Sequence, residues 1–171
     1  VVHPSADPQE VAVAMVRGAY EYQGQKCSAA SRVYVPKSLW PSVRDRAVAM
    51  MRDIKMGDTR DFRNFMSAAI DKKAFTKIGG YIEHAKRNAK IVQGGGSNGR
   101  TGYFIEPTVI ETTNPKYRTM CEELFGPVLT LHVYDDNRID EMLKICDETS
   151  PYGLTGAIIS QDRHFVEKAK D

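Results

Sequence analysis

Apolar residues recur at helical spacing in some segments of the chain and at strand spacing in others. From Val11 to Tyr22 they follow one another at intervals of three and four, the pattern of a helix with one buried face. Asp7 stands at the position of a helix cap, and Pro8 occupies the first helical position. The pattern therefore predicts a first helix that begins at Pro8 and ends at Gly24.

The rest of the chain alternates between the two patterns. Asp71 is the expected cap of a third helix, although the Gly79-Gly80 pair inside it costs up to about 1 kcal/mol per residue relative to Ala. Alternating strands and helices favour an α/β domain, with a mainly parallel open sheet and helices on both faces. Further helices are predicted at 38–54, 72–86, 138–149 and 165–171, and strands at 32–35, 91–93, 103–105, 108–110, 128–134 and 154–159.

Composition narrows the class of protein. A length of 171 residues suits one domain, and 24 basic against 22 acidic residues give a net charge of +2. This balance argues against a surface for nucleic acid or an anionic membrane. No apolar run approaches the ~20 residues of a spanning helix. Three widely spaced cysteines do not form a disulfide framework, so a reducing compartment is expected.

The two ends of the sequence resemble cut ends. The chain begins with Val1 rather than Met, and it stops inside a charged, helix-like segment at Asp171 without a helix stop signal. We expect residues 1–171 to be a piece of a longer protein.

Cys27 is the first candidate for chemistry. Residues 24–29 read Gly-Gln-Lys-Cys-Ser-Ala and lie between a predicted helix and a predicted strand. The neighbours of Cys27 are polar, and Lys26 is placed to favour the thiolate by electrostatics. A buried structural thiol is the usual alternative for any single cysteine, and the local sequence leaves both interpretations open. For Cys121 and Cys146 we expect the structural role.

A second candidate segment covers residues 122–128, which read Glu-Glu-Leu-Phe-Gly-Pro-Val. Acidic residues of this kind are commonly solvated. Here, however, Phe125 and the turn-forming Gly126-Pro127 stand where the chain enters a predicted buried strand. In open α/β sheets this is a place where ligands are contacted.

Two other sequence patterns give weaker evidence of a functional site. Gly94, Gly96 and Gly99 match the glycine spacing of a dinucleotide-binding loop, but an extended segment that stops at Pro107 follows them in place of the required helix. We interpret this run as a flexible loop. The histidines show no metal-ligand spacing, so no metal site is predicted, and a hydrolase pairing of a histidine with Cys27 stays open. They are His3, His84, His132 and His164.

Residues 24–27 and 122–128 together resemble the NAD(P)-dependent aldehyde dehydrogenase superfamily, and Tyr-Gly-Leu-Thr-Gly at 152–156 resembles a third segment of that family. The resemblance covers essentially the whole chain. Residues 21–29 and 38–41 are most similar to the L-glutamate γ-semialdehyde (1-pyrroline-5-carboxylate) dehydrogenases of proline catabolism.

The resemblance implies roles for particular residues. Cys27 would be the nucleophile that attacks the aldehyde, and hydride would then pass to NAD and leave a thioester on the sulfur. The backbone N–H of Cys27 would stabilise the developing oxyanion. Glu123 would accept hydrogen bonds from the nicotinamide ribose, and Phe125 would pack beside the nicotinamide. Ser28 would contact the carboxylate end of the substrate.

The resemblance also implies what lies outside the chain. Residues 1–171 would be a partial catalytic domain that lacks the cofactor-binding Rossmann domain and the C-terminal segment, and the chain alone would be inactive as a dehydrogenase. The full-length protein would be a homo-oligomer, cytoplasmic in a bacterium or in the mitochondrial matrix of a eukaryote. The alternatives are another aldehyde dehydrogenase with a different substrate, a thiol acyl-transferase or esterase built on Cys27, and a scaffold with an inert thiol.

Overall fold

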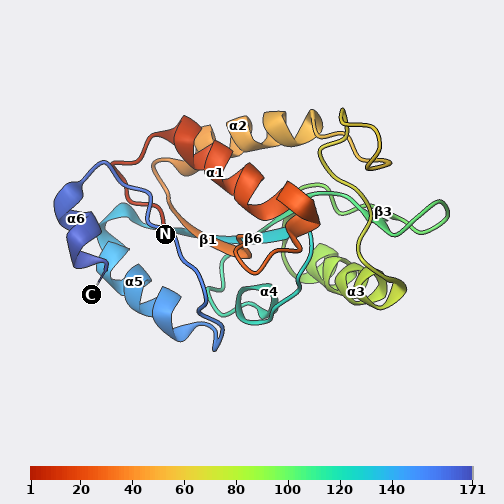
Figure 1. Cartoon of the computed structure of the whole chain (residues 1–171). Coiled ribbons are helices and arrows are strands. Elements are labelled where there is room, and N and C mark those ends of the chain that lie inside the picture. Colours follow the sequence, from red (N-terminus) through yellow and green to blue (C-terminus); the bar gives the residue numbers. More distant parts are fainter. Residues whose placement is uncertain (171) are drawn as a thin grey trace.

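A four-stranded sheet of order β1-β6-β5-β2 lies at the centre of the computed structural model, which describes residues 1–170 (Figure 1). β1 (Arg32–Pro36), β6 (Val128–Tyr134) and β5 (Thr108–Thr112) are parallel to one another, and β2 (Lys90–Gln93) joins β5 antiparallel at one edge. The predicted α/β class with a mainly parallel sheet is confirmed.

Helices cover both faces of this sheet (Figure 1). α1 (Pro8–Tyr20) and α2 (Trp40–Arg52) pack on one face, and α3 (Lys72–Asn88), α4 (Arg118–Cys121) and α5 (Ile139–Glu148) pack on the other. Side chains alternate along β1, so Val33 and Val35 join the core under α1 and α2, whereas Tyr34 joins the second core. Burial on two faces explains why the parallel strands are apolar at consecutive positions.

The first helix begins as predicted and ends earlier. The Asp7 carboxylate accepts hydrogen bonds from the N–H groups of Gln9 and Glu10, at 2.8 and 3.0 Å. α1 ends at Tyr20, whose buried hydroxyl donates to the carbonyl oxygen of Thr108 at 3.0 Å. This bond ties the end of α1 to the sheet. The chain continues into η1 (Glu21–Gly24), a short 3₁₀ segment interrupted by the left-handed residues Tyr22 and Gln23.

The remaining helices keep the predicted order with adjusted ends. Helices predicted at 38–54 and 138–149 are α2 and α5; α2 is shorter by two residues at each end and α5 by one residue at each end. A 3₁₀ turn, η2 (Asp136–Arg138), precedes α5. The last predicted helix, at 165–171, is α6 (Arg163–Lys168), and residue 171 lies outside the described residues. Within residues 1–170, no helix is long and apolar enough to cross a membrane.

α3 passes uninterrupted through its glycine pair. A Cβ atom added at Gly79 or Gly80 would meet nothing within 4 Å. We therefore expect Gly79→Ala and Gly80→Ala each to stabilise the fold by up to about 1 kcal/mol, because alanine loses less backbone entropy in a helix. Urea denaturation of each variant measures this, and a lowered midpoint would show that the glycines serve some other purpose.

The strand predicted at 154–159 is wrong. Leu154 is 75% exposed, and the segment makes a single parallel bridge, between Ile159 and Val2. The Val2 N–H in turn donates to the carbonyl oxygen of Tyr34 at 3.0 Å. An apolar run forms a strand only where a neighbouring strand pairs with it over several residues. Within residues 1–170, the segment around Val2 pairs with it at one position.

The glycine run is more ordered than a flexible loop. β3 (Ser97–Asn98) and β4 (Phe104–Ile105) pair as a short antiparallel hairpin. Gly94 has a φ of +79°, and an added Cβ would lie 2.1 Å from the carbonyl oxygen of Pro107. The glycine there permits close backbone packing. No helix follows it before α4, so its neighbourhood in the described chain is not that of a dinucleotide-binding loop.

Candidate functional site

Cys27 lies in the loop between η1 and β1, and its side chain is exposed. Two backbone bonds shape the loop: the Ala29 N–H donates to the Lys26 carbonyl oxygen at 3.0 Å, and the Ala30 N–H donates to that of Gly18 at 2.9 Å. Within residues 1–170, the backbone N–H of Cys27 donates to no acceptor. The loop thus presents a thiol together with an unused hydrogen-bond donor.

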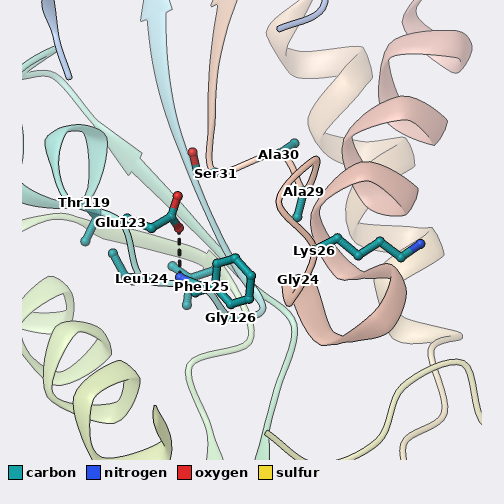
Figure 2. Close-up of a pocket in the computed structure, with 11 residues that line it drawn as sticks. Gly24, Lys26, Ala29, Ala30, Ser31, Thr119, Glu123, Leu124, Phe125 and Gly126 are labelled. Carbon is teal, nitrogen blue, oxygen red and sulfur yellow. Dashed lines mark hydrogen bonds between the residues drawn. The ribbon is translucent and has the colours of Figure 1, made fainter. Parts of the chain in front are cut away.

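The second candidate segment lies between α4 and β6. Phe125 has a φ of +57°, a left-handed conformation that non-glycine residues adopt at a cost of about 1–3 kcal/mol. Its N–H donates to the Glu123 carboxylate at 2.9 Å, as Figure 2 shows. Leu124 is buried beneath the segment, while the Phe125 ring is 45% exposed. The Phe125 ring therefore lies at the surface, on a residue whose backbone is strained.

A direct contact between two glycines joins the two segments. Gly24 has a φ of +64°, and a Cβ added there would lie 2.4 Å from the carbonyl oxygen of Gly126 and 2.7 Å from that of Ala19. Both distances are far below van der Waals contact, and both obstacles are backbone atoms. Glycine at position 24 therefore allows the Cys27 loop to pack directly on the segment that carries Glu123 and Phe125.

A shallow hollow lies between the two segments (Figure 2). Glu123 and Phe125, both predicted site residues, line it together with residues on either side of Cys27. Cys27 and Ser28 themselves are exposed next to it, and Ser28 makes no side-chain hydrogen bond within residues 1–170. The lining residues are Gly24, Lys26, Ala29, Ala30, Ser31, Thr119, Glu123, Leu124, Phe125, Gly126 and Val128.

The charge of Lys26 is paired with a carboxylate. Its ammonium lies 2.7 Å from the Glu21 carboxylate, and in Figure 2 its side chain extends away from Glu123 and Phe125. The Lys26 hydrogen bond, together with that of Arg17, holds the pKa of Glu21 below its usual value. Because Lys26 is already paired, the predicted electrostatic support of a Cys27 thiolate is not evident in this arrangement.

The hollow lies at the amino ends of the parallel strands, since both segments precede the strands that they enter. The general tendency of open α/β sheets concerns the carboxyl ends, so it was the wrong reason for expecting a ligand contact at Phe125. A separate cavity of about 400 Å³ does lie at the carboxyl ends. Its lining includes His132, whose pKa is lowered by burial, and none of the predicted site residues in the described chain.

The histidines are placed elsewhere. His132 contacts the Thr112 carbonyl oxygen near the carboxyl ends of the two central strands, and His84 Nδ1 lies 2.9 Å from the Tyr117 hydroxyl. No histidine lines the hollow within residues 1–170. A hydrolase pairing of a histidine with Cys27 therefore has no support from the geometry of this part of the chain.

The other two cysteines have the structural environment that was predicted. Cys121 and Cys146 are both half-buried, and Cys146 packs against the core formed by α3 and α5. Cys27 is the exposed thiol among the described residues.

Sequence reasoning missed the contacts made by α3. The Lys77 ammonium donates to the backbone carbonyl oxygen of Glu123 at 2.6 Å. Ile78 packs closely behind Gly126: a Cβ added at Gly126 would lie 2.3 Å from the Cδ1 atom of Ile78. Neither residue carries a motif, and Lys77 lies 46 positions before Glu123 in the chain. Only the folded arrangement brings them together.

Comparison with known proteins places this geometry in a family. The chain is 52% identical over 170 residues to the mitochondrial delta-1-pyrroline-5-carboxylate dehydrogenase of Dictyostelium discoideum and 50% identical over 171 residues to that of Danio rerio. Each match covers 98% of this chain, and the chain spans about 30% of the length of these curated relatives.

Solved structures agree with the sequence matches. The delta-pyrroline-5-carboxylate dehydrogenase of Mycobacterium tuberculosis matches with a TM-score of 0.91 and 40% identity, over 99% of this chain and 31% of that one. A structure of the same enzyme bound with NAD matches with a TM-score of 0.90 and 40% identity, over 98% of this chain and 30% of that one. The model of the "Aldehyde dehydrogenase family" matches residues 1–171, and the chain belongs to this family.

Proposed function

We propose that this chain is part of the catalytic domain of an NAD-dependent dehydrogenase that oxidises L-glutamate γ-semialdehyde to the carboxylate in proline catabolism. The observation that carries the proposal is the contact between Gly24 and Gly126, which packs the loop of the exposed Cys27 against the segment of Glu123 and Phe125. Family membership supports the reaction type, and the names of the relatives support the substrate.

The full-length protein would supply what these residues lack. We place a cofactor-binding Rossmann domain and a C-terminal segment outside residues 1–171, and the span of about 30% of the relatives' length supports this. We further propose that the full-length protein is a homo-oligomer. The eukaryotic relatives are named as mitochondrial enzymes, which favours the mitochondrial matrix for a eukaryotic source, and the cytoplasm is the counterpart in a bacterium.

Cys27 would act as the nucleophile. Its thiolate would attack the aldehyde carbon and form a carbon–sulfur bond, while the carbonyl oxygen becomes an oxyanion. The uncommitted N–H of Cys27 would donate to that oxygen, a type of contact typically worth about 3 kcal/mol in the transition state. Loss of hydride from this adduct leaves a thioester, which water hydrolyses to the carboxylate and the free thiolate.

The residues beside Cys27 suit a nicotinamide nucleotide. NAD would supply the hydride acceptor. The exposed Glu123 carboxylate retains acceptor capacity beyond its bond to the Phe125 N–H, as hydrogen bonding to ribose hydroxyls requires. The exposed Phe125 ring offers a flat apolar surface to a planar ring. Ser28, exposed beside the nucleophile, is placed to contact the substrate's own carboxylate.

The proposed function is tested with the full-length protein by NAD reduction, comparing L-glutamate γ-semialdehyde with propanal. A higher kcat/KM for the semialdehyde is expected. Equal or reversed preference would remove the substrate assignment and keep the dehydrogenase. A folded protein that reduces NAD with neither aldehyde would contradict the proposed reaction.

Glu123→Ala is expected to raise KM for NAD by about tenfold or more, since hydrogen bonds to a charged group are lost. Glu123→Gln, which keeps an acceptor for the Phe125 N–H, should have a smaller effect. Glu83→Ala is the control, because Glu83 is another exposed glutamate, which pairs with Lys86. Steady-state kinetics at varied NAD concentration measure this KM. An unchanged KM in Glu123→Ala would contradict the proposed ribose contact.

A further inference from the structure

Glu122 directly precedes Glu123, the residue proposed to bind the nicotinamide ribose. Two side chains from different helices hold Glu122. Arg118, at the start of α4, lies 2.8 Å from the Glu122 carboxylate through its Nε atom. Tyr81, on α3, donates its hydroxyl to the other carboxylate oxygen of Glu122. One carboxylate thereby connects α4 to α3 at the point where the segment with Glu123 and Phe125 begins.

The two partners of Glu122 also contact each other. The Arg118 guanidinium lies over the Tyr81 ring, 4.2 Å from its centroid, and its NH2 group donates to the Tyr81 hydroxyl at 3.2 Å. A cation above an aromatic face is attracted by the ring quadrupole. These three residues form a closed set of contacts, here called the Tyr81–Arg118–Glu122 network.

The charges of this network are mutually supporting. The hydrogen bonds from Arg118 and then Tyr81 hold the pKa of Glu122 below its usual value, so its carboxylate is charged at neutral pH. The Glu122 carboxylate raises the pKa of Tyr81, which therefore keeps the proton that it donates. Isolated surface ion pairs contribute little to stability, and a network with several fixed contacts chiefly restricts geometry.

α3 holds the following residues from the same side. Lys77 lies one turn before Tyr81 and donates to the Glu123 carbonyl oxygen, and Ile78 packs behind Gly126. Between these points Phe125 has a left-handed backbone, which persists only when its surroundings determine it. The Tyr81–Arg118–Glu122 network fixes the start of this segment, and Ile78 supports its end.

We infer that Tyr81 and Arg118 are positioning residues for nicotinamide nucleotide binding, because through Glu122 they hold the Glu123 carboxylate and the Phe125 ring in place. This inference rests on the proposed function of Glu123 and Phe125. A pre-ordered segment binds its ligand without the entropy cost of ordering it first. Loss of the network should therefore weaken NAD binding and leave the chemistry at Cys27 unchanged.

The test uses the full-length protein and four variants. Arg118→Met removes the guanidinium but keeps a long apolar side chain, and Tyr81→Phe removes one hydroxyl and keeps the ring. Arg138→Met is the matched control, since Arg138 is an exposed arginine that pairs with Glu141 on α5. Arg118→Lys tests whether a charge alone restores function, which the planar geometry of arginine argues against.

Three readouts separate positioning from a general structural role. For Arg118→Met we expect KM for NAD to rise about fivefold or more while kcat stays within about twofold of wild type. Tyr81→Phe should show a smaller rise, and Arg138→Met none. Without any cofactor, amide hydrogen exchange in residues 121–126 should accelerate about tenfold in Arg118→Met. The rate of Cys27 alkylation by iodoacetamide should not change.

Each outcome decides a different claim. Unchanged exchange in residues 121–126 of Arg118→Met would overturn the inference, even if the wild-type protein proved inactive as a dehydrogenase. Faster exchange with an unchanged KM for NAD would show that the network orders the segment without serving the cofactor, which also overturns it. A wild-type protein that neither binds nor reduces NAD would overturn the proposed function, and the positioning role toward NAD with it.

Discussion

Cys27→Ala is expected to lower NAD-dependent aldehyde oxidation by the full-length protein at least about a thousandfold, because loss of a covalent nucleophile removes the reaction path itself. The binding of NAD should be retained, since Glu123 and Phe125 stay on the opposite segment. Turnover and equilibrium binding of NAD, measured on the same preparation, check both halves of this prediction.

The other two cysteines are the controls for this result. Cys121→Ala and Cys146→Ala remove half-buried thiols and should leave kcat within a few-fold of wild type. If Cys27→Ala turned over at a comparable rate, the nucleophile would have to be sought elsewhere. The scaffold interpretation would gain if Cys27 in the folded protein also reacted with iodoacetamide no faster than free cysteine.

Gly24→Ala should have the second largest effect. Its Cβ would lie 2.4 Å from one backbone oxygen and 2.7 Å from another, in a left-handed conformation. Strain and overpacking each cost about 1–3 kcal/mol, so we expect destabilisation of about 3 kcal/mol or more. Because relief requires moving the Cys27 loop away from Gly126, dehydrogenase activity should fall together with stability. Denaturation curves and turnover measure the two effects.

Gly80→Ala is the matched control for Gly24→Ala, since the same change there meets open space. An unaltered denaturation midpoint and full activity in Gly24→Ala would mean that the two glycine backbones are not in contact. The account of how the site is assembled would then be wrong.

Much of the architecture could be predicted because it depends on local pattern. The Asp7 cap and the apolar spacing define α1, and the continuous apolar run of β6 matches a strand buried on two faces. The glycine pair lowers the helix propensity of α3 without breaking the helix, because Ile78, Tyr81 and Ile82 are buried on its core-facing side. Tertiary burial outweighed a propensity of about 1 kcal/mol.

What could not be predicted depends on contacts between distant segments. No local signal shows that Gly24 meets Gly126, that Tyr22 and Gln23 adopt left-handed φ values of 56° and 59°, or that Lys26 is already paired. The strand predicted near Leu154 failed for a related reason. Its apolar residues need a partner edge, which the sequence of the segment itself cannot supply.

The central claim, that Cys27 forms the covalent intermediate, is tested most directly by trapping it. Full-length protein, NAD and L-glutamate γ-semialdehyde are mixed and quenched in acid within one turnover. Trypsin, cutting after Lys26 and Arg32, then yields a short peptide in which Cys27 is the one thiol. We predict the mass of a glutamyl thioester on this peptide. Substrate consumption with an unmodified Cys27 peptide, or with the acyl group on Cys121 or Cys146, would contradict the account.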